Sequence, residues 1–484
     1  MDWVCDIGEM LGLKYSIRDP IHGFIHFNEW EKSIIDHPWF QRLRRIRQLA
    51  FTEYVYPGAT HTRFEHSLGV MHLATSMFLR IISKCRKDLF GYLNSKEPLT
   101  KTKFRSEVIH ALQMLRIAAL LHDVGHGPFS HAMETVLPRD PSGAQYTHED
   151  YSYAATVQLK DRIDGSRWNT DWAKRAGCEK VRAQEVASLL VKRADIKAKV
   201  GRLWPLARTL LNSQLDADRL DYLLRDSHYA GVKYGVFDLE RVLEALTFCV
   251  DYPDKQDATP EIMLALEEAD FEAAESVVLA RHRMNTMVYF HKTRRIFDLM
   301  LAQAMPVVLG KKGGALPAPD EVGAYLDWDD GLVHAKLLSV RDKSQVPLSG
   351  AIHGRVFPRL AGTSESDSVT KDLIRALEEE GFAVATDKDL SAGPPQVWVD
   401  TGVAFTTYKS EESLEIRLRP SRSVGTGRFK ERLKPISLSE DHVLLKLWEA
   451  LKSTQHRVYL TGVKQQREKV AAIIRDCGGV PWEG

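Results

Sequence analysis

The sequence predicts a mainly α-helical protein with an all-helical core and a smaller α+β lobe on its C-terminal side. Across residues 1–309, apolar residues recur at three- and four-residue spacings, which is the period of amphipathic helices. The run Gly310–Pro319 is rich in the glycine, lysine and proline typical of a linker. Beyond it, short stretches alternate apolar and polar residues as strands do. We therefore expect a core at 1–309, a linker at 310–320 and an α+β lobe with a regulatory or oligomerising role at 321–484.

The order of the expected elements follows from these periods and from the turn residues between them. Residues 17–27 read as a short extended hairpin, because Pro20 and Gly23 supply turn chemistry. Helices are expected at 29–49, from His61 onward, up to Asp123, at 168–211, at 215–226, from Phe237 onward and at 272–304, with a polar loop or helix end at 82–110. In the lobe we expect strands at 396–407, 413–419 and 456–461, a helix at 465–475, and a basic solvated loop at 421–432.

Composition excludes several classes of protein. The 484 residues hold 66 lysines and arginines against 65 acidic residues, so net charge gives no indication of nucleic-acid binding, although a local basic groove stays open. Five scattered cysteines form no Cys-x-x-Cys pair, which argues against a zinc ribbon or disulfide framework and fits a reducing cytoplasm. The first residues are acidic and precede no long apolar run, so neither a signal peptide nor a membrane span is expected.

The most informative stretch is Leu120–His131, in which a His-Asp pair ends an apolar run. The glycines and the proline of this stretch stop the helix, so His122 and Asp123 are expected in its last turn. His126 and His131 then follow on an irregular segment. Borderline divalent metals bind imidazole nitrogen and carboxylate oxygen, which this pair supplies. An isolated His-Asp pair also fits an ordinary helix end, where a histidine interacts favourably with the helix dipole.

Two further patterns favour the metal interpretation. In the stretch His61–Gly69, Thr62 and Glu65 have the spacing of a capping box, which places His66 in the first turn of a helix. Downstream, Asp218, Tyr222 and Asp226 (or Arg225) follow one another at four-residue steps and share one helix face. An acidic and aromatic stripe of this kind is also common on solvated surfaces.

These residues resemble the H…HD…D signature of HD-domain metal-dependent phosphohydrolases. The flanking sequence is similar, more specifically, to the SAMHD1-like deoxynucleoside triphosphate triphosphohydrolases, from about Tyr15 to about Leu301. The motifs that carry this resemblance are Asp19–Gly23, Phe40–Arg44, Tyr56–Ala59, Arg63–Gly69 and His122–His131.

The resemblance implies a chemistry and a set of residues for it. One divalent ion per site, Mn, Mg, Fe or Zn, is expected on His66, His122, Asp123 and Asp218. The residues expected to assist phosphoryl chemistry or reach the phosphates are His148, Glu134, His126 and His131; the family commonly has Asp at the position of Glu134. His148 also fits a structural histidine. The expected products are a deoxynucleoside and tripolyphosphate.

The same resemblance implies residues that bind the substrate. Gln48 would hydrogen-bond the 3′-hydroxyl and Leu49 would crowd the 2′ position, so that a ribonucleotide is rejected. Base and phosphate contacts are expected from Arg63, Arg219, Tyr222, Asp226, Tyr289, His291 and Lys292. By spacing alone, Gln48 also fits a surface amide and Tyr289 a core residue.

An effector nucleotide site is expected at Asp36, Gln41 and Arg44, which match an effector-binding set of regulated family members. Tyr15 stands where those members commonly have a basic residue. A run of arginines here also fits a solvated helix face. Family analogy further implies a homo-oligomer, a dimer or tetramer.

Two alternatives use other substrates or other functions. An HD-domain nuclease or phosphodiesterase acting on nucleic acid or a cyclic nucleotide would use the same four metal ligands. A nucleotide-binding regulatory protein would use the site without turnover. The presence of Gln48, Tyr222, Asp226 and Tyr289 favours the mononucleotide substrate, and the biological role stays open between nucleotide-pool control and anti-phage defence.

Overall fold

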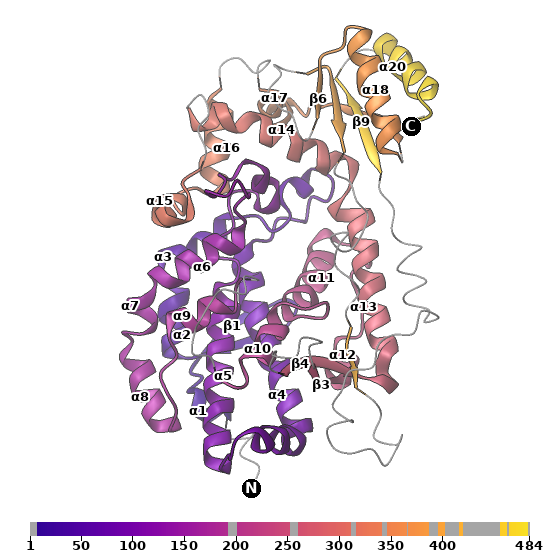
Figure 1. The fold of residues 1–484 in the computed structure, drawn as a ribbon. Coiled ribbons are helices and arrows are strands. Elements are labelled where there is room, and N and C mark those ends of the chain that lie inside the picture. The colour runs from indigo at the N-terminus through magenta and orange to yellow at the C-terminus, as the bar shows by residue number, and fades with distance from the viewer. Residues whose placement is uncertain are drawn as a thin grey trace.

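A computed structural model describes residues 7–191, 201–251, 260–310, 316–340, 346–364, 366–386, 395–401, 416–419, 455–461 and 464–482. The fold is mainly helical, as predicted, and its small mixed sheets include one in the C-terminal part. Figure 1 shows the helical body with the orange and yellow elements of the C-terminal part at one end. Among the described helices, none combines the length and apolar character that crossing a membrane requires.

The N-terminal elements frame one side of the helical body. They are α1 (Ile7–Leu11), β1 (Tyr15–Asp19), β2 (Gly23–Phe27), α2 (Glu29–Ile35), α3 (Pro38–Gln41), η1 (Arg42–Arg45) and η2 (Ala50–Tyr54). The hairpin prediction is confirmed, since β1 and β2 pair antiparallel. The single helix expected at 29–49 is wrong. Pro38 disfavours helical geometry at the residue before it, and Arg47 forms a bridge with Thr62 instead of continuing a helix.

Two long helices form the centre of the body, α4 (Arg63–Lys96) and α5 (Lys101–Leu121), which pack against each other. The capping box of Thr62 and Glu65 starts α4 as predicted. The polar connector expected at 82–110 is wrong, because most of it belongs to these two helices. Its polar residues lie on outer faces, while Leu89 and Val108 are fully buried on the inner faces.

The rest of the body surrounds this pair. Its elements are η3 (Ser130–Val136), α6 (His148–Gln158), α7 (Lys160–Ile163), α8 (Arg167–Ala176), α9 (Ala183–Ser188), α10 (Trp204–Leu211), α11 (Ala217–Ala230), α12 (Leu239–Ala245), β3 (Leu246–Asp251), β4 (Glu261–Glu267), η4 (Glu268–Asp270), α13 (Phe271–Met284), the π-helical turn η5 (Asn285–Tyr289) and α14 (Lys292–Leu309). The helix expected at 272–304 is therefore interrupted, and Tyr289 lies in the interruption. The hairpin of β3 and β4 was not predicted.

The C-terminal elements are η6 (Pro319–Glu321), α15 (Val322–Tyr325), α16 (Asp330–Ser339), α17 (Pro347–Gly354), β5 (Arg359–Ser364), α18 (Asp367–Glu379), β6 (Val384–Thr386), β7 (Val397–Asp400), β8 (Leu418–Arg419), β9 (His456–Leu460), α20 (Lys464–Asp476) and β10 (Val480–Pro481). Five strands form a sheet in the order β10-β5-β9-β7-β6, against which α18 and α20 pack, whereas β8 pairs with β4. The strands predicted at 396–407 and 456–461 are confirmed as β7 and β9 where the structure describes them, and so is the helix α20. The end of the strand predicted at 413–419 forms β8, and residues 402–415 lie outside the described residues. The predicted basic loop at 421–432 lies outside the described residues.

Most buried apolar side chains of the described residues belong to two hydrophobic clusters. The larger one runs from α1 through the body and continues through Leu316, Tyr325 and Leu348. The smaller one lies between the five-stranded sheet and its helices and includes Ala361 and Leu373. Residues 316–351 thus pack with the helical body, and the predicted boundary at 310–320 stays a prediction.

Candidate metal and nucleotide site

The end of α5 presents the His-Asp pair to the interior. His122 is the C-cap of α5, and the turn after it packs against α6 without room for a side chain. A Cβ atom on Gly125 would lie 2.2 Å from the backbone nitrogen of Ser152. The Ser152 hydroxyl accepts a hydrogen bond from the Gly125 amide at 2.9 Å and donates one to the His122 carbonyl at 2.6 Å. These contacts fix the position of the pair.

Three helix ends bring the first cluster together. His66 lies in the first turn of α4, Asp218 in the first turn of α11, and one ligand atom of each, with one of His122, lies within 4.8 Å of the others. The Nε2 atom of His66 is 3.0 Å from an Asp218 oxygen. Asp123 adjoins the cluster, with its two carboxylate oxygens 3.5 Å from His66 Nε2 and 3.4 Å from His122 Nε2.

The histidines of this cluster are oriented by hydrogen bonds on their far sides. His66 Nδ1 donates to Asp221 at 2.8 Å, and His122 Nδ1 donates to the Ala119 carbonyl at 2.7 Å. Both Nε2 atoms are buried and make no well-aligned hydrogen bond within the described residues, although His66 Nε2 lies close to Asp218. A carboxylate or carbonyl behind each imidazole is the arrangement that fixes the tautomer of metal-binding histidines. The donor set therefore fits a divalent ion such as Mn, Mg, Fe or Zn.

The support behind His66 was not predicted. Arg225 binds both oxygens of Asp221, at 2.8 and 2.9 Å, and also donates to Asp19 at 2.7 Å. His22 Nε2 lies 2.6 Å from the same Asp221 carboxylate. All four side chains are buried or nearly so. The sequence signal for this network is the spacing of Asp221 and Arg225, which an exposed ion pair shares.

The charges of the cluster favour ionised carboxylates. Burial opposes the charge of Asp123, but Arg63 and the neighbouring histidines hold its pKa well below the usual value. Burial likewise opposes the charge of Asp218, and His122 and His66 lower its pKa. For His66, Asp218 and Asp221 outweigh burial and raise the pKa to about 10. A cation bound between these carboxylates would replace the proton on His66.

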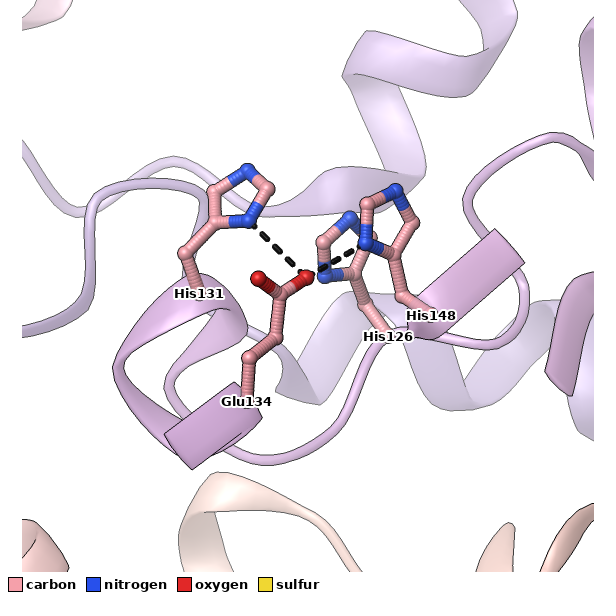
Figure 2. A group of neighbouring side chains, drawn as sticks. All are labelled: His126, His131, Glu134 and His148. Carbon is pink, nitrogen blue, oxygen red and sulfur yellow. Dashed lines mark hydrogen bonds and ion pairs between the residues drawn. The ribbon is translucent and has the colours of Figure 1, made fainter. Parts of the chain in front are cut away.

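A second cluster lies beside the first and comprises His126, His131, Glu134 and His148 (Figure 2). One Glu134 oxygen is 2.5 Å from His148 Nδ1 and 3.1 Å from His131 Nδ1. The rings of His126 and His148 stack with centroids 3.8 Å apart. His126 Nε2 is 3.3 Å from an Asp123 oxygen, so His126 connects the second cluster to the first.

The second cluster combines neutral and charged groups. Burial and the nearby Arg63 hold the pKa of His126 well below its usual value. Burial opposes the charge of Glu134, yet His131 and His148 lower its pKa well below the usual value. Burial also opposes the charge of His148, and its bond to Glu134 raises its pKa. The Glu134 side chain, at a position where the family commonly has Asp, is long enough to contact both histidines.

The predicted sugar and base residues form two groups. Gln48 and Leu49 are buried, and the Oε1 atom of Gln48 has no hydrogen-bond partner in the part of the chain that the structure describes. Tyr289 donates to Asp226 at 2.7 Å, and its ring lies edge-on to Tyr222 with centroids 6.0 Å apart. Asp226, at the end of the acidic and aromatic face of α11, is therefore buried, whereas the Asp218 side chain at its start is 36% exposed.

A histidine that was not singled out as a site residue joins this set. His61 Nε2 lies 2.7 Å from the second oxygen of Asp226, and its backbone carbonyl accepts from the Gln48 amide at 3.1 Å. His61 also stacks on Tyr229 with ring centroids 4.6 Å apart. It connects the Gln48 segment to α11, and its only sequence signal is its place beside the His66 motif.

The predicted phosphate-binding residues are distributed more widely. Arg63 binds Asp123 and donates to the Ser130 hydroxyl at 2.8 Å, so it lies within the site. Arg219 binds Asp216, the N-cap of its own helix. The other two residues begin α14. The ring of His291 caps that helix through Thr293, and the Lys292 ammonium lies 3.7 Å from the ring centroid of Trp482 in the C-terminal part.

The three predicted effector residues are Asp36 at the C-cap of α2, Gln41 in α3 and Arg44 in η1. Arg44 donates to the side-chain oxygen of Gln41 at 2.9 Å, and its guanidinium lies over the ring of Phe64. Asp36 pairs with Lys32 one turn earlier on its own helix. The structure thus joins two of the three directly, and effector binding stays a prediction.

Comparison with known families agrees with this geometry. A model described as an HD domain matches residues 63–199, which hold His66, the His122–Asp123 pair and the whole second cluster. The chain contains an HD domain. A model described as an HD associated region matches residues 237–388, after the HD domain and Asp218.

Relatives of this HD domain are found in distant organisms. An uncharacterized protein of Methanocaldococcus jannaschii is 32% identical over 289 residues, which cover 60% of this chain and 49% of that protein. The deoxynucleoside triphosphate triphosphohydrolase SAMHD1 of Mus musculus is 29% identical over 341 residues, 65% of this chain and 48% of that protein. The human protein of that name is 28% identical over 355 residues, 68% and 51% respectively. The chain spans about half the length of the curated relatives it matches.

Proposed function

We propose that this protein is an HD-domain metal-dependent phosphohydrolase that converts deoxynucleoside triphosphates to deoxynucleosides and tripolyphosphate. The observation that supports this most directly is a set of buried atoms with unused bonding capacity. The buried Nε2 atoms of His66 and His122 face the carboxylates of the first cluster and make no well-aligned hydrogen bond within the described residues. The buried Oε1 atom of Gln48, elsewhere in the site, has no hydrogen-bond partner among these residues either. An ion satisfies the first two, and a sugar hydroxyl satisfies the third. The similarity to SAMHD1 proteins supports the same substrate class.

The reaction joins a water oxygen to the α-phosphorus and breaks its bond to the 5′-oxygen, which must gain a proton. His66, His122, Asp123 and Asp218 would hold the metal, which supplies Lewis acidity toward the phosphate oxygens. Arg63, held by Ser130 beside Asp123, would lower the cost of the negative charge that builds up on the phosphate oxygens as water attacks the α-phosphorus.

The second cluster would handle the proton. Glu134 holds His148 by Nδ1, so the opposite nitrogen, Nε2, is the atom through which His148 exchanges a proton with the reacting groups. The raised pKa of His148 favours the protonated form that a general acid needs. His126 and His131, which pack around the same carboxylate, would contact the phosphates.

Discrimination against ribonucleotides would depend on the buried Gln48 and Leu49. The unpartnered Gln48 oxygen would accept a hydrogen bond from a 3′-hydroxyl, and Leu49 would leave a 2′-hydroxyl buried without a partner. Tyr222 and Tyr289 would pack against the base. The rejection of an extra hydroxyl in this way is expected to favour the deoxy substrate by roughly 10²-fold.

The purified protein should be incubated separately with dNTPs, NTPs and single-stranded DNA, each with Mg²⁺ or Mn²⁺, with Asp123→Ala as the control. Products are identified by chromatography, and a mixture of nucleotides supplies any effector. Deoxynucleoside and tripolyphosphate, absent with the variant, is the expected result. Shortened DNA with intact dNTPs would move the substrate to nucleic acid, and binding without turnover in every mixture would make the protein a nucleotide-binding regulator.

Regulation is part of the same proposal. An effector nucleotide would bind at Asp36, Gln41 and Arg44, and a dimer or tetramer would form in the cytoplasm. Stimulation of dNTP hydrolysis by a second nucleotide, lost in Arg44→Ala while basal turnover is kept, tests the effector site. Sedimentation with and without nucleotides tests assembly.

A further inference from the structure

The carboxylate of Asp330, the first residue of α16, is shared between two segments of the site. Its Oδ1 atom accepts from the Phe129 amide at 2.7 Å, and its Oδ2 atom accepts from the Arg47 amide at 2.8 Å. Asp330 belongs to the HD-associated region, whereas Phe129 belongs to the HD domain and Arg47 precedes it. Burial raises the pKa of Asp330 to about 7, because a charged carboxylate at this buried position costs free energy of folding.

The two segments carry different parts of the site. One continues from Arg47 directly to Gln48 and Leu49. The other follows the His-Asp pair and leads to His131. Phe129 and Ser130 have φ angles of 56° and 55°, left-handed values that cost non-glycine residues energy and persist only where the surroundings enforce them.

The turn at Phe129 and Ser130 is also joined directly to the segment that begins at Arg47 and leads to Gln48. The Ser130 hydroxyl donates to the Arg47 carbonyl at 2.5 Å and accepts from Arg63 at 2.8 Å. Asp330 therefore holds the two amides while Ser130 bridges the same peptide region on its other side. A shift at either amide would move Gln48 relative to Arg63.

Neighbours of Asp330 contact the same two segments. Tyr325 donates to the Gly125 carbonyl at 3.0 Å, and Arg42 donates to the Trp328 carbonyl at 2.8 Å. Asp329 pairs with Arg45 at 2.5 Å. Residues 325–330 thus contact both the turn that follows the His-Asp pair and the segment before Gln48. Asp330 is the residue that binds both at once.

We propose that Asp330 is a positioning residue for sugar discrimination, through which the HD-associated region sets the place of Gln48 and Leu49 relative to the metal cluster. This inference rests on the proposed dNTP hydrolysis. A carboxylate suits the task because its two oxygens accept two amides at once. An asparagine offers one oxygen, and its NH₂ group would face the second amide, donor against donor.

The test compares Asp330→Asn with Asp329→Asn, a change at the adjacent acid. This control weakens only the pair with the exposed Arg45, which contributes little, keeps a good N-cap for α16 and leaves both amide bonds in place. Hydrogen exchange is followed in peptides that contain Arg47 and Phe129. In parallel, kcat/KM is measured for matched dNTP and NTP substrates. We expect Asp330→Asn to speed exchange at one or both amides and to lower the dNTP/NTP ratio of kcat/KM about tenfold or more. Asp329→Asn should change neither.

Unchanged hydrogen exchange in Asp330→Asn would show that Asp330 does not hold the two amides. Faster exchange with an unchanged dNTP/NTP ratio of kcat/KM would overturn its role in discrimination. An equal loss in Asp329→Asn would reduce the effect to general destabilisation and overturn the proposal too. If Asp330→Asn does not fold, Asp330→Glu, which keeps the charge but lengthens the side chain, is read by the same two measurements. Wild-type protein that hydrolyses no nucleotide removes the proposed function, while the exchange data still decide whether Asp330 holds the two amides.

Discussion

The Nδ1 atom of His66 lies 2.8 Å from a carboxylate oxygen of Asp221. This contact fixes the imidazole so that Nε2 faces Asp218 at 3.0 Å. Because Asp221 is itself held by Arg225, the orientation of His66 depends on a buried network that reaches back to the N-terminal hairpin. The ligand geometry is therefore set by residues that never contact the ion.

Asp221→Asn should weaken divalent metal binding by roughly 10–100-fold, because an amide supports the Nδ1–H of His66 less strongly and disturbs the bond to Arg225. Metal content after dialysis against graded Mn²⁺, measured by mass spectrometry well below the unfolding temperature, gives the affinity.

The matched control is Asp226→Asn, a buried acid on the same helix that bonds to His61 and Tyr289 instead of His66. It should alter nucleotide binding and leave Mn²⁺ affinity within about twofold of the wild type, since it touches no residue of the metal cluster. Equal losses in the two variants would show that α11 stability, and not the orientation of His66, controls the metal.

Glu134→Gln should lower kcat by about 10²-fold or more without changing metal content, because His148 loses the carboxylate that holds its Nδ1–H. Glu134→Asp keeps the charge but shortens the side chain, so we expect a kcat between those of the wild type and the glutamine variant. Steady-state kinetics with matched metal analysis provide the measurement. Loss of metal in Glu134→Gln would instead make this residue part of the ion's coordination.

Gly69→Ala should destabilise the protein and weaken metal binding together. A Cβ atom at position 69 would lie 2.0 Å from an Asp221 oxygen and 2.4 Å from an Arg225 nitrogen, so the pair behind His66 must move. We expect a loss of several kcal/mol, as for other changes that disrupt a buried ion pair. Urea unfolding and Mn²⁺ binding are the readouts.

Gly323→Ala is the control for this substitution, because its Cβ atom would meet only Trp39, at 4.0 Å, and the residue lies in the short helix α15. Replacing a helical glycine at an open position should be neutral or stabilising by about 0.5–1 kcal/mol. A Gly69→Ala protein as stable as Gly323→Ala would mean that the Asp221–Arg225 pair is not rigidly placed.

The sequence located His66, His122 and Asp218, which the structure brings together, because they sit at helix ends whose signals are local. Their role as metal ligands stays a prediction. The capping box before His66 and the glycines after His122 locate these residues without any knowledge of packing. Asp221 could not be found in this way. An acid four residues before an arginine is usually an exposed pair, and only the packing of α11 on α4 buries it.

The errors in the fold have related causes. The stretch 82–110 is rich in charge, yet a helix needs only one apolar face, and residues such as Leu89 supply it. Strand β3 is buried on both faces from Leu246 to Val250, so the alternation that reveals strands is missing. The role of Asp330 depends on contacts across more than two hundred residues, which no local pattern contains.

His72 on α4 makes stability sensitive to acid. Burial lowers its pKa to about 4, with His22 and Arg116 acting in the same direction and Asp19 and Asp221 opposing them. In the unfolded chain a histidine takes a proton near pH 6.5, so between pH 6.5 and 4 only the unfolded state is protonated at this residue. The free energy of unfolding that depends on a neutral His72 is therefore fully present above pH 6.5. It falls by up to about 3 kcal/mol as the pH drops from 6.5 to 4.

His72→Gln removes the titration and keeps a polar helix former at the position. The difference in unfolding free energy between the wild type and this variant should therefore change by up to about 3 kcal/mol between pH 7 and 4, with the wild type losing more. Urea unfolding at half-unit pH steps measures it. A parallel decline in the two proteins would place the acid sensitivity on other groups, since a neutral buried His72 cannot leave the two pH profiles alike.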